Sequence, residues 1–261
     1  MFNPQSTVSK INRGESRQVD KMFTDVFNLA NDVYKLSGGT FDPTVAPLVN
    51  LWGFGHKSEP TNPDSTDVKY ALAAVGMSKC RICDNELLRD DDRLEFDFSA
   101  IAKGYGVDCV AAMLHRNGAT NYMVEIGGEI AVRGKNPIGR PWRIQIDAPT
   151  SNIPGDSALR TIELIDCAIA TSGNYRNYRH NADGSTYGHT INPCTGYPVK
   201  TSTLSATVIA PTCVMADALA TACMAMKSGD AISMIEKINN VDVILAISDS
   251  IGGFSTISTL D

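Results

Sequence analysis

The feature that most constrains the fold is a run of strand-like segments in the middle of the chain with no helix between them. Strand-forming residues bounded by turn residues give NYMVEIGGEIAVRG, WRIQIDAP, LRTIELID and CAIATSG, all between residues 121 and 173. The first segment breaks into two strands at Gly127 and Gly128. Strands joined by short turns pair antiparallel, because parallel strands need a crossover of a dozen or more residues. A doubly wound parallel fold is therefore disfavoured.

Helices are predicted before and after this run. Apolar residues recur at helical spacing from about Ser16 to Leu36, where Gly38 and Gly39 stop the helix. Further helices are predicted at 66–75, 103–116, 212–229 and 230–238. The remaining predicted strands are 81–84 and 93–99, paired around an acidic turn NELLRDDD, and then 203–210, 241–248 and a last strand after Gly253. This order indicates an α+β fold with largely antiparallel sheets.

Size and charge narrow the class of protein. A chain of 261 residues with 43% hydrophobic residues fits one large domain or two closely joined ones. The net charge is −6 and no run of Lys or Arg is present, so nucleic acid is an unexpected partner. No apolar run approaches the roughly 18 residues of a membrane span, and the first residues contain no signal-peptide core.

Seven cysteines are scattered through the sequence. An odd number in a chain of this size does not indicate a disulfide framework, so we expect most of them to be free and buried. Cys80 and Cys83 have CxxC spacing, but no second CxxC or paired His completes a zinc set. The segment around them, KCRICD, is instead typical of a strand.

The segment YGHTINPCTGYPV, residues 187–199, places His189 just before a turn built from Asn, Pro, Thr and Gly. An imidazole titrates near neutral pH, and rigid exposed turns often carry reactive side chains. The alternative is a hairpin whose histidine simply faces water. The segment alone does not decide between the two.

Two further segments suggest an anion site. Thr40, Phe41 and Asp42 precede Pro43, so their loop could present amides and a carboxylate to a ligand. The alternative for Asp42, which the residue alone favours, is an Asx-turn or a helix cap. In FDFSAIAKGYGVD, Asp97 ends a predicted strand, and Lys103 lies where a glycine-bearing helix begins. A helix start with a lysine suits a phosphate, but the pattern is neither a P-loop nor GxGxxG, and an exposed lysine is the alternative.

The sharpest local anomaly is Asp217 in the apolar helix TCVMADALATACMAMKSG. No basic residue lies within four positions of it, and Thr221 lies on the same helix face. A buried carboxylate here needs a partner, and Mg²⁺ is a suitable one because it accepts carboxylate and neutral oxygen ligands beside phosphates. The alternative is a face that meets solvent.

Six segments together resemble the ApbE family, the FAD:protein FMN transferases. In family order they are GGTFDPTVAPLVNLWGFG, FDFSAIAKGYGVD, VEIGGEIAVRG, ATSGNYRNY, HTINPCTGYPV and TVIAPTCVMADALATA. The resemblance extends over about residues 1–250. It implies a T-fold-like α+β arrangement, in which two related units with antiparallel sheets pack against helices, and a single flavin transferase domain over residues 1–261.

The resemblance also implies an activity. Family members bind FAD with Mg²⁺, cleave its pyrophosphate, and attach FMN through its phosphate to a Ser or Thr hydroxyl of an acceptor flavoprotein, with release of AMP. Some members instead hydrolyse FAD to FMN and AMP, and a flavin-binding protein without turnover is a third possibility for this chain. The resemblance further implies an extracytoplasmic location, either periplasmic or membrane-anchored.

Site residues follow from the resemblance position by position. His189 matches the proposed catalytic histidine. The metal positions are Ala100, through its carbonyl, together with Asp217 and Thr221. The implied FAD contacts are Thr40, Phe41, Asp42, Asp97, Lys103 and Ile191, with Phe2 where the family often has an aromatic residue near the adenine.

The chain departs from the family pattern in three places. Ala220 stands where some relatives have a further carboxylate, so we expect more water around the metal, and Asn192 replaces a frequent Asp. The family's leading segment, with an early strand and a residue that closes over FAD, has no counterpart before Met1. We therefore expect either a truncated chain or a short form of the family.

Overall fold

The computed structural model describes residues 3–55, 62–149, 157–174, 178–180, 186–249 and 253–260. The chain forms two compact units, unit 1 with Met1–Ala100 and Tyr178–Lys200, and unit 2 with Ile101–Asn177 and Thr201–Asp261. Each unit therefore consists of two separate stretches of the chain. Among the described residues, no helix combines the length and the apolar character that a membrane crossing requires.

Unit 2 contains a six-stranded, wholly antiparallel sheet with the strand order β12-β11-β10-β7-β4-β3. A separate two-stranded sheet pairs β5 with β6. The strands are β3 (Tyr122–Ile126), β4 (Glu129–Arg133), β5 (Trp142–Asp147), β6 (Ala158–Leu164), β7 (Cys167–Gly173), β10 (Thr203–Ala210), β11 (Asp242–Ser248) and β12 (Phe254–Ser258). The helices are α5 (Ala102–Arg116), α6 (Cys213–Met224) and α7 (Ser228–Ile235). The predicted α+β class with antiparallel sheets is confirmed.

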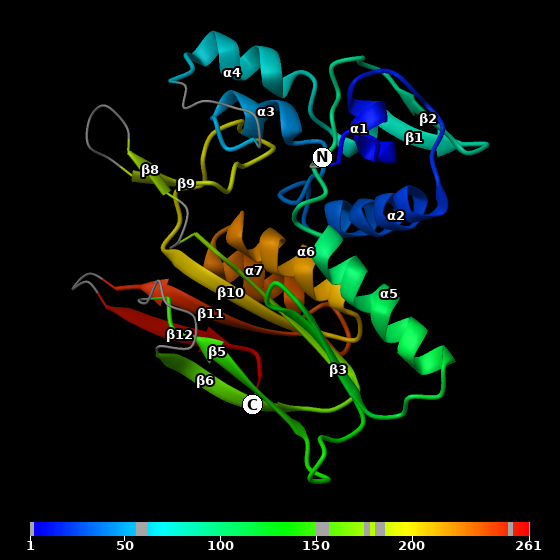
Figure 1. Cartoon of the computed structure of the whole chain (residues 1–261). Coiled ribbons are helices and arrows are strands. Elements are labelled where there is room, and N and C mark those ends of the chain that lie inside the picture. Colours follow the sequence, from blue (N-terminus) through cyan, green and yellow to red (C-terminus); the bar gives the residue numbers. More distant parts are fainter. Residues whose placement is uncertain are drawn as a thin grey trace. The chain divides into compact units, whose positions relative to one another are not determined.

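The two faces of this sheet pack differently. Helices α5, α6 and α7 run along one face (Figure 1), where Val107 of α5 and Cys213 of α6 join Val124, Ala131 and Ala168 of the strands in one apolar cluster. On the other face, the apolar side chains of β5 and β6 form a second cluster with those of the sheet. Its members are Val132, Ile144, Ile146, Ile162, Leu164, Ile169, Ile209 and Ile244. Both faces of the sheet are thus covered.

Helix α6 is buried on nearly every side, and a side chain of α5 caps its beginning. Among the described residues, the side chain of Thr212, which precedes α6, makes no hydrogen bond that caps the helix. Instead, the carboxylate of Asp108 accepts hydrogen bonds from the backbone N–H groups of Cys213 (3.0 Å) and Val214 (2.8 Å). A carboxylate at a helix N-terminus satisfies otherwise unpaired N–H groups and complements the helix dipole.

Replacing Asp108 with alanine is expected to destabilise unit 2. The two N–H groups that begin α6 lose their acceptor, and helix caps of this kind are worth about 1–2 kcal/mol. The urea concentration at the midpoint of unfolding should therefore decrease in Asp108→Ala. Asp108→Asn keeps one acceptor oxygen, so its midpoint should lie between those of wild type and Asp108→Ala. Asp230→Ala, at an exposed position in the first turn of α7, is the matched control. An equal loss of stability in the control would show that Asp108 has no special role in capping α6.

Unit 1 is mainly helical and contains two short antiparallel hairpins, β1–β2 and β8–β9. Its helices are α1 (Thr7–Asn12), α2 (Lys21–Leu36), α3 (Ala46–Leu51), α4 (Ser65–Leu72) and the 3-10 helix η1 (Met77–Lys79). Its strands are β1 (Cys80–Cys83), β2 (Glu86–Arg89), β8 (Tyr178–His180) and β9 (Thr186–Gly188). The strands of the chain are therefore divided unevenly, with the large sheet in unit 2.

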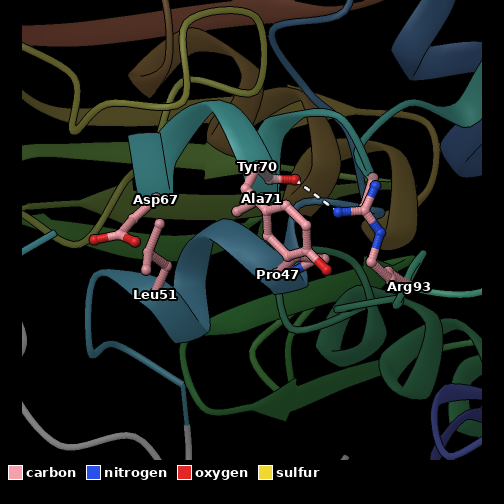
Figure 2. Close-up of a pocket in the computed structure, with 7 residues that line it drawn as sticks. Pro47, Leu51, Asp67, Tyr70, Ala71 and Arg93 are labelled. Carbon is pink, nitrogen blue, oxygen red and sulfur yellow. Dashed lines mark hydrogen bonds between the residues drawn. The ribbon is translucent and has the colours of Figure 1, made fainter. Parts of the chain in front are cut away.

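A shallow pocket of about 280 Å³ lies between α3 and α4 (Figure 2). Its floor is apolar, and its polar side chains already have partners. The guanidinium of Arg93 forms a salt bridge with Asp91 (2.6 Å) and donates to the backbone carbonyl of Tyr70 (3.1 Å). It also lies 4.2 Å from the centre of the aromatic ring of Tyr70. Asp67 belongs to the capping box of α4. The polar residues of this pocket therefore serve the local fold.

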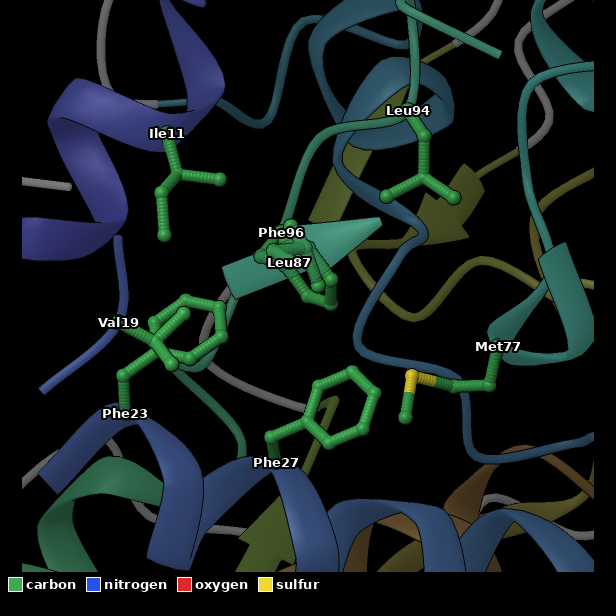
Figure 3. Packing of buried hydrophobic residues seen from close by; sticks show 8 residues of the cluster. All are labelled: Ile11, Val19, Phe23, Phe27, Met77, Leu87, Leu94 and Phe96. Carbon is green, nitrogen blue, oxygen red and sulfur yellow. The ribbon is translucent and has the colours of Figure 1, made fainter. Parts of the chain in front are cut away.

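An apolar cluster of unit 1 forms around a group of phenylalanines (Figure 3). Phe96 packs edge-on against Phe23 of α2, with ring centres 5.4 Å apart, and against Phe27 at 6.0 Å. Aromatic pairs favour this edge-to-face geometry. The cluster consists of Ile11, Val19, Phe23, Phe27, Met77, Leu87, Leu94 and Phe96. The apolar face of α2 that the sequence periodicity predicted packs into this cluster through Phe23 and Phe27.

One predicted strand pair is wrong. Residues 93–99 do not form a strand; β1 pairs with β2 at Glu86–Arg89, inside the stretch that was predicted to be the acidic turn. The turn is only two residues long, and both Asp84 (φ 48°) and Asn85 (φ 61°) are left-handed. Asp and Asn tolerate this conformation, which a type I′ turn requires at both positions, so the hairpin closes immediately.

Helix boundaries also differ from prediction. Helix α2 begins at Lys21 because Asp20 caps it, accepting from the N–H of Phe23 at 2.8 Å. Helix α4 ends at Leu72, three residues before the predicted end. The long predicted helix 212–229 is divided between α6 and α7, and α7 begins and ends earlier than predicted. All seven cysteines are free, but only Cys213 and Cys223 are buried, so the expected burial of most of them is wrong.

Candidate functional site

Asp217 lies on α6 and is 2% exposed, which rules out the solvent-facing alternative. Its partners come from α5 rather than from its own helix. Oδ2 accepts a hydrogen bond from the backbone N–H of Gly104 (2.9 Å), and Oδ1 lies 3.5 Å from Nζ of Lys103. Burial raises the pKa of Asp217, whereas Lys103 and the Gly104 N–H lower it. The carboxylate is therefore buried but incompletely neutralised.

The close approach of α5 to α6 depends on Gly104. A Cβ atom at this position would lie 2.4 Å from the carbonyl oxygen of Cys213 and 2.7 Å from Cα of Val214. Only glycine leaves room for these backbone atoms. The sequence therefore builds the site by crossing the two helices at a glycine whose N–H points at Asp217.

Glu129, at the start of β4, is a site residue that the sequence prediction missed. It is 3% exposed, and its Oε1 accepts from Nζ of Lys103 at 2.7 Å. Burial raises the pKa of Glu129 and Lys103 lowers it in part. Burial lowers the pKa of Lys103, but the carboxylates of Asp217 and Glu129 raise it above its usual value overall. Lys103 is therefore a cation held between two buried carboxylates.

Thr221 follows Asp217 by one helical turn and is half-buried. Its hydroxyl shares a hydrogen bond of 3.1 Å with the hydroxyl of Ser172 on β7, a second residue that the prediction missed. Ser172 lies in the ATSGNY segment, which the sequence analysis noted, but nothing near it in the sequence indicates that it contacts Thr221. Unit 2 thus brings together Lys103, Asp217 and Thr221 of the predicted residues.

These side chains fit a hard divalent cation. The donors are a buried carboxylate and a hydroxyl, both oxygen ligands that Mg²⁺ accepts. The contact between Oδ1 of Asp217 and Nζ of Lys103 is long, at 3.5 Å. Ala100, the third predicted metal position, is a half-buried turn residue at the end of the first stretch of unit 1. Within the described ranges, no group of three or more His, Cys, Asp and Glu side chains gathers as a metal cluster. A cation here would take further ligands from water or phosphate.

In unit 1, the loop Thr40–Asp42 follows two left-handed glycines, Gly38 (φ 61°) and Gly39 (φ 85°). Thr40 is half-buried, and Phe41 is buried at 3% exposure. The carboxylate of Asp42 accepts from the N–H (2.8 Å) and hydroxyl (2.6 Å) of Thr44.

This geometry is the Asx-turn that the sequence left open as an alternative. The other carboxylate oxygen of Asp42 accepts from the N–H of Met77 at 3.1 Å. Burial raises the pKa of Asp42, and these hydrogen bonds lower it. The carboxylate therefore ties the loop to the start of η1. A role of the loop in binding FAD stays a prediction.

Asp97 is not at the end of a strand, because residues 93–99 contribute only an isolated bridge from Glu95 to Val45. Its carboxylate accepts from the N–H (2.8 Å) and the hydroxyl of Ser99, and its N–H donates to the carbonyl of Pro43 (2.7 Å). The last of these hydrogen bonds joins the segment that carries Asp97 to Pro43, the residue after Asp42.

His189 follows β9 directly and is half-buried. Its ring packs edge-on against Phe54, with centres 6.3 Å apart. Ile191, two residues later, is 5% exposed and lies in the apolar cluster of α3 and α4. The histidine therefore stands at the edge of a packed segment and is only partly open to water.

The turn after His189 is held rigidly. The side-chain oxygen of Asn192 accepts from the N–H groups of Cys194 (2.8 Å) and Thr195 (3.1 Å), which an aspartate could also do. Trp52 donates its ring N–H to the carbonyl of Gly196 at 2.8 Å. The thiol of Cys194 contacts the carbonyl of Gly39 at 3.6 Å, so this turn lies beside the loop that carries Thr40.

Unit 1 thus brings together the two predicted segments around Thr40–Asp42 and His189–Ile191. None of the described site residues lines the pocket between α3 and α4. Phe2, the predicted neighbour of the adenine, lies outside the described residues.

Comparison with known proteins identifies the family. The sequence model of the ApbE family matches residues 1–245. A Vibrio cholerae protein named FAD:protein FMN transferase is 39% identical over 255 residues, which is 96% of this chain and 75% of that protein. A Haemophilus influenzae protein of the same name is 39% identical over 248 residues, which is 93% of this chain and 70% of that protein.

Solved structures agree with the sequence comparison. The Vibrio cholerae flavin transferase ApbE superposes with a TM-score of 0.87 at 38% identity, covering 99% of this chain and 82% of that one. The apo form of the Pseudomonas stutzeri flavinyl transferase ApbE gives a TM-score of 0.88 at 32% identity, covering 99% and 80%. The family match spans most of the sequence, and the structural match spans nearly all of it. The chain belongs to the ApbE family.

Proposed function

We propose that the protein transfers FMN from FAD to a Ser or Thr hydroxyl of an acceptor flavoprotein in the presence of Mg²⁺, with release of AMP. The observation that carries the proposal is the buried carboxylate of Asp217 beside Lys103 and Thr221. Such a group of charges and hydroxyls suits a magnesium-bound diphosphate. The names of the Vibrio and Haemophilus relatives support flavin transfer as the reaction.

In the proposed reaction, the acceptor hydroxyl attacks the phosphorus on the FMN side of the diphosphate. A bond forms between the hydroxyl oxygen and this phosphorus, while the bond from the phosphorus to the bridging oxygen breaks and AMP leaves with that oxygen. His189 takes or orients the proton that the hydroxyl loses. Lys103 donates to the diphosphate, and its positive charge favours the bound dinucleotide.

Asp217, Thr221 and the carbonyl of Ala100 would hold the cation. Bound Mg²⁺ supplies neutralisation of the negative charge on the diphosphate. Asp217 contributes the only full negative charge of this ligand set, since the other two donors are a neutral hydroxyl and a neutral carbonyl. Asp217 is therefore the residue on which metal binding depends most.

One incubation tests the proposed function. The protein is mixed with FAD, Mg²⁺ and a candidate acceptor, AMP is measured by chromatography, and the acceptor is weighed by mass spectrometry. We expect AMP together with an acceptor whose mass is raised by one FMN unit. AMP with free FMN would indicate hydrolysis instead, and FAD binding without either product would indicate a flavin-binding protein without turnover.

Replacing His189 with asparagine should abolish most transfer while leaving FAD bound. A general base typically contributes about 10²- to 10⁴-fold to the rate, and asparagine cannot accept the proton. The measurement is the initial rate of AMP formation, together with FAD binding followed by flavin fluorescence. His115→Asn, at an exposed position on α5, is the matched control. An unchanged rate of transfer in His189→Asn would show that His189 takes no part in the reaction.

A further inference from the structure

Glu129 is an unusual buried charge in unit 2. Its side chain is 4% exposed, and only one of its two carboxylate oxygens has a partner. Within the described part of the chain, Oε2 is buried without a hydrogen bond. A buried carboxylate with an unpaired oxygen is costly, so its presence calls for a compensating role.

The partner of Glu129 is also the partner of Asp217. Nζ of Lys103 lies 2.7 Å from Oε1 of Glu129 and 3.5 Å from Oδ1 of Asp217. The first distance is that of a charge-assisted hydrogen bond, and the second is at the outer limit of any hydrogen bond. The ammonium is thus shared unequally, and Glu129 holds it more closely.

The β3–β4 hairpin fixes this arrangement. Gly127 (φ 62°) and Gly128 (φ 100°) form its two-residue turn, and Ile126 pairs with Glu129 across it. The turn also covers the stem of Lys103, since a Cβ atom on Gly127 would lie 3.5 Å from Cδ of the lysine. Glu129 therefore meets Lys103 from rigid backbone rather than from a mobile loop.

We propose that Glu129 is a positioning residue that holds the ammonium of Lys103 and so keeps it from pairing fully with Asp217. Oδ1 of Asp217 then stays available for a divalent cation. Without Glu129, the flexible lysine would close onto the one remaining carboxylate and compete with the cation for it. This inference rests on the proposed function, because it assigns the cation to Asp217.

Binding of Mn²⁺, used as a probe for the Mg²⁺ site, tests the inference directly. The free ion is counted by electron paramagnetic resonance during titration of the protein without FAD. Glu129→Gln keeps the size of the side chain but cannot neutralise Lys103, and we expect its Mn²⁺ affinity to decrease by about 10- to 100-fold, as for other residues that support a metal ligand. In the reaction, the Mg²⁺ concentration for half-maximal AMP formation should increase, and the rate should recover at saturating Mg²⁺.

A double variant identifies the cause of the loss. If Lys103 is the competitor, Lys103→Met combined with Glu129→Gln should restore Mn²⁺ affinity to near the wild-type value, whereas Lys103→Met alone should bind at least as well as wild type. Glu125→Gln is the matched control, because it removes one exposed carboxylate from the same hairpin. Thermal unfolding of each variant confirms that it is folded.

Two outcomes would overturn the inference alone. Glu129→Gln could bind Mn²⁺ as tightly as wild type, or the double variant could bind as weakly as Glu129→Gln, which would show that Glu129 does not act through Lys103. A wild-type protein that binds no Mn²⁺ and turns over without Mg²⁺ would overturn the metal site of the proposed function, and this inference with it.

Discussion

Replacing Asp217 with asparagine is expected to decrease AMP formation from FAD by on the order of 10³-fold at millimolar Mg²⁺. The amide keeps the size of the side chain and can still accept from the N–H of Gly104, so α6 should stay in place. It lacks the negative charge that binds the cation. Metal neutralisation of a phosphoryl group is worth several kcal/mol, and each 1.36 kcal/mol is tenfold in rate. The rate is measured across a Mg²⁺ titration, in which the variant should respond weakly or not at all.

The matched control for this substitution is Asp230→Asn, which removes an exposed carboxylate from the first turn of α7. It should follow the wild-type Mg²⁺ curve. If Asp217→Asn also followed that curve, or if wild type turned over fully in EDTA, the assignment of the metal to Asp217 would be wrong. A variant that loses activity and also unfolds at lower temperature would be compared by its Mn²⁺ binding at a temperature where it is folded.

The parts of the fold that depend on residues close together in the sequence could be predicted from the sequence. Strands β3 and β4 follow from two apolar runs around Gly127 and Gly128, whose positive φ angles suit the turn. Strand β1 was predicted to within one residue, but the prediction failed for β2, because the acidic stretch that contains it was predicted to be a turn. There the two residues Asp84 and Asn85 complete the turn, and the apolar leucines that follow them make β2.

The candidate site was predictable only in part, because its partners are far apart in the sequence. Helical spacing placed Asp217 and Thr221 on one face, but it could not show that the face is buried. That depends on Gly104, which is 113 positions away from Asp217. Glu129 was missed for the same reason. The one available signal was the two-residue turn, which places Glu129 on the same side of β4 as the buried Ala131.

Asp42 shows the opposite case, in which local reasoning was informative. The sequence left an Asx-turn open as an alternative to a ligand contact, and the carboxylate does accept from Thr44 within the same loop. Its bond to Met77 is the part that no local rule gives, since it joins residues 35 positions apart. Local propensity therefore identified the turn, whereas tertiary structure explains why a carboxylate is buried there.

Replacing Gly104 with alanine is expected to destabilise unit 2 strongly. The new Cβ would lie 2.4 Å from the carbonyl oxygen of Cys213 and 2.7 Å from Cα of Val214, and backbone atoms cannot rotate away as a side chain can. Overpacking typically costs about 1–3 kcal/mol, and a clash with backbone belongs at the upper end. For a chain of this size, a loss of about 3 kcal/mol corresponds to a decrease in Tm of roughly 6–12 °C. Differential scanning calorimetry measures it.

Gly106→Ala is the matched control, two residues further along the same helix. Its Cβ would meet only Cδ1 of Ile126, at 3.5 Å, which is ordinary contact with a flexible side chain. Alanine is favoured over glycine in a helix by about 1 kcal/mol, so this variant should be as stable as wild type or slightly more stable. Equal stability of the two variants would mean that α5 can move away from α6. In that case the N–H of Gly104 could not hold Asp217 in a fixed position, and the rigid carboxylate on which metal binding is proposed to depend would be absent.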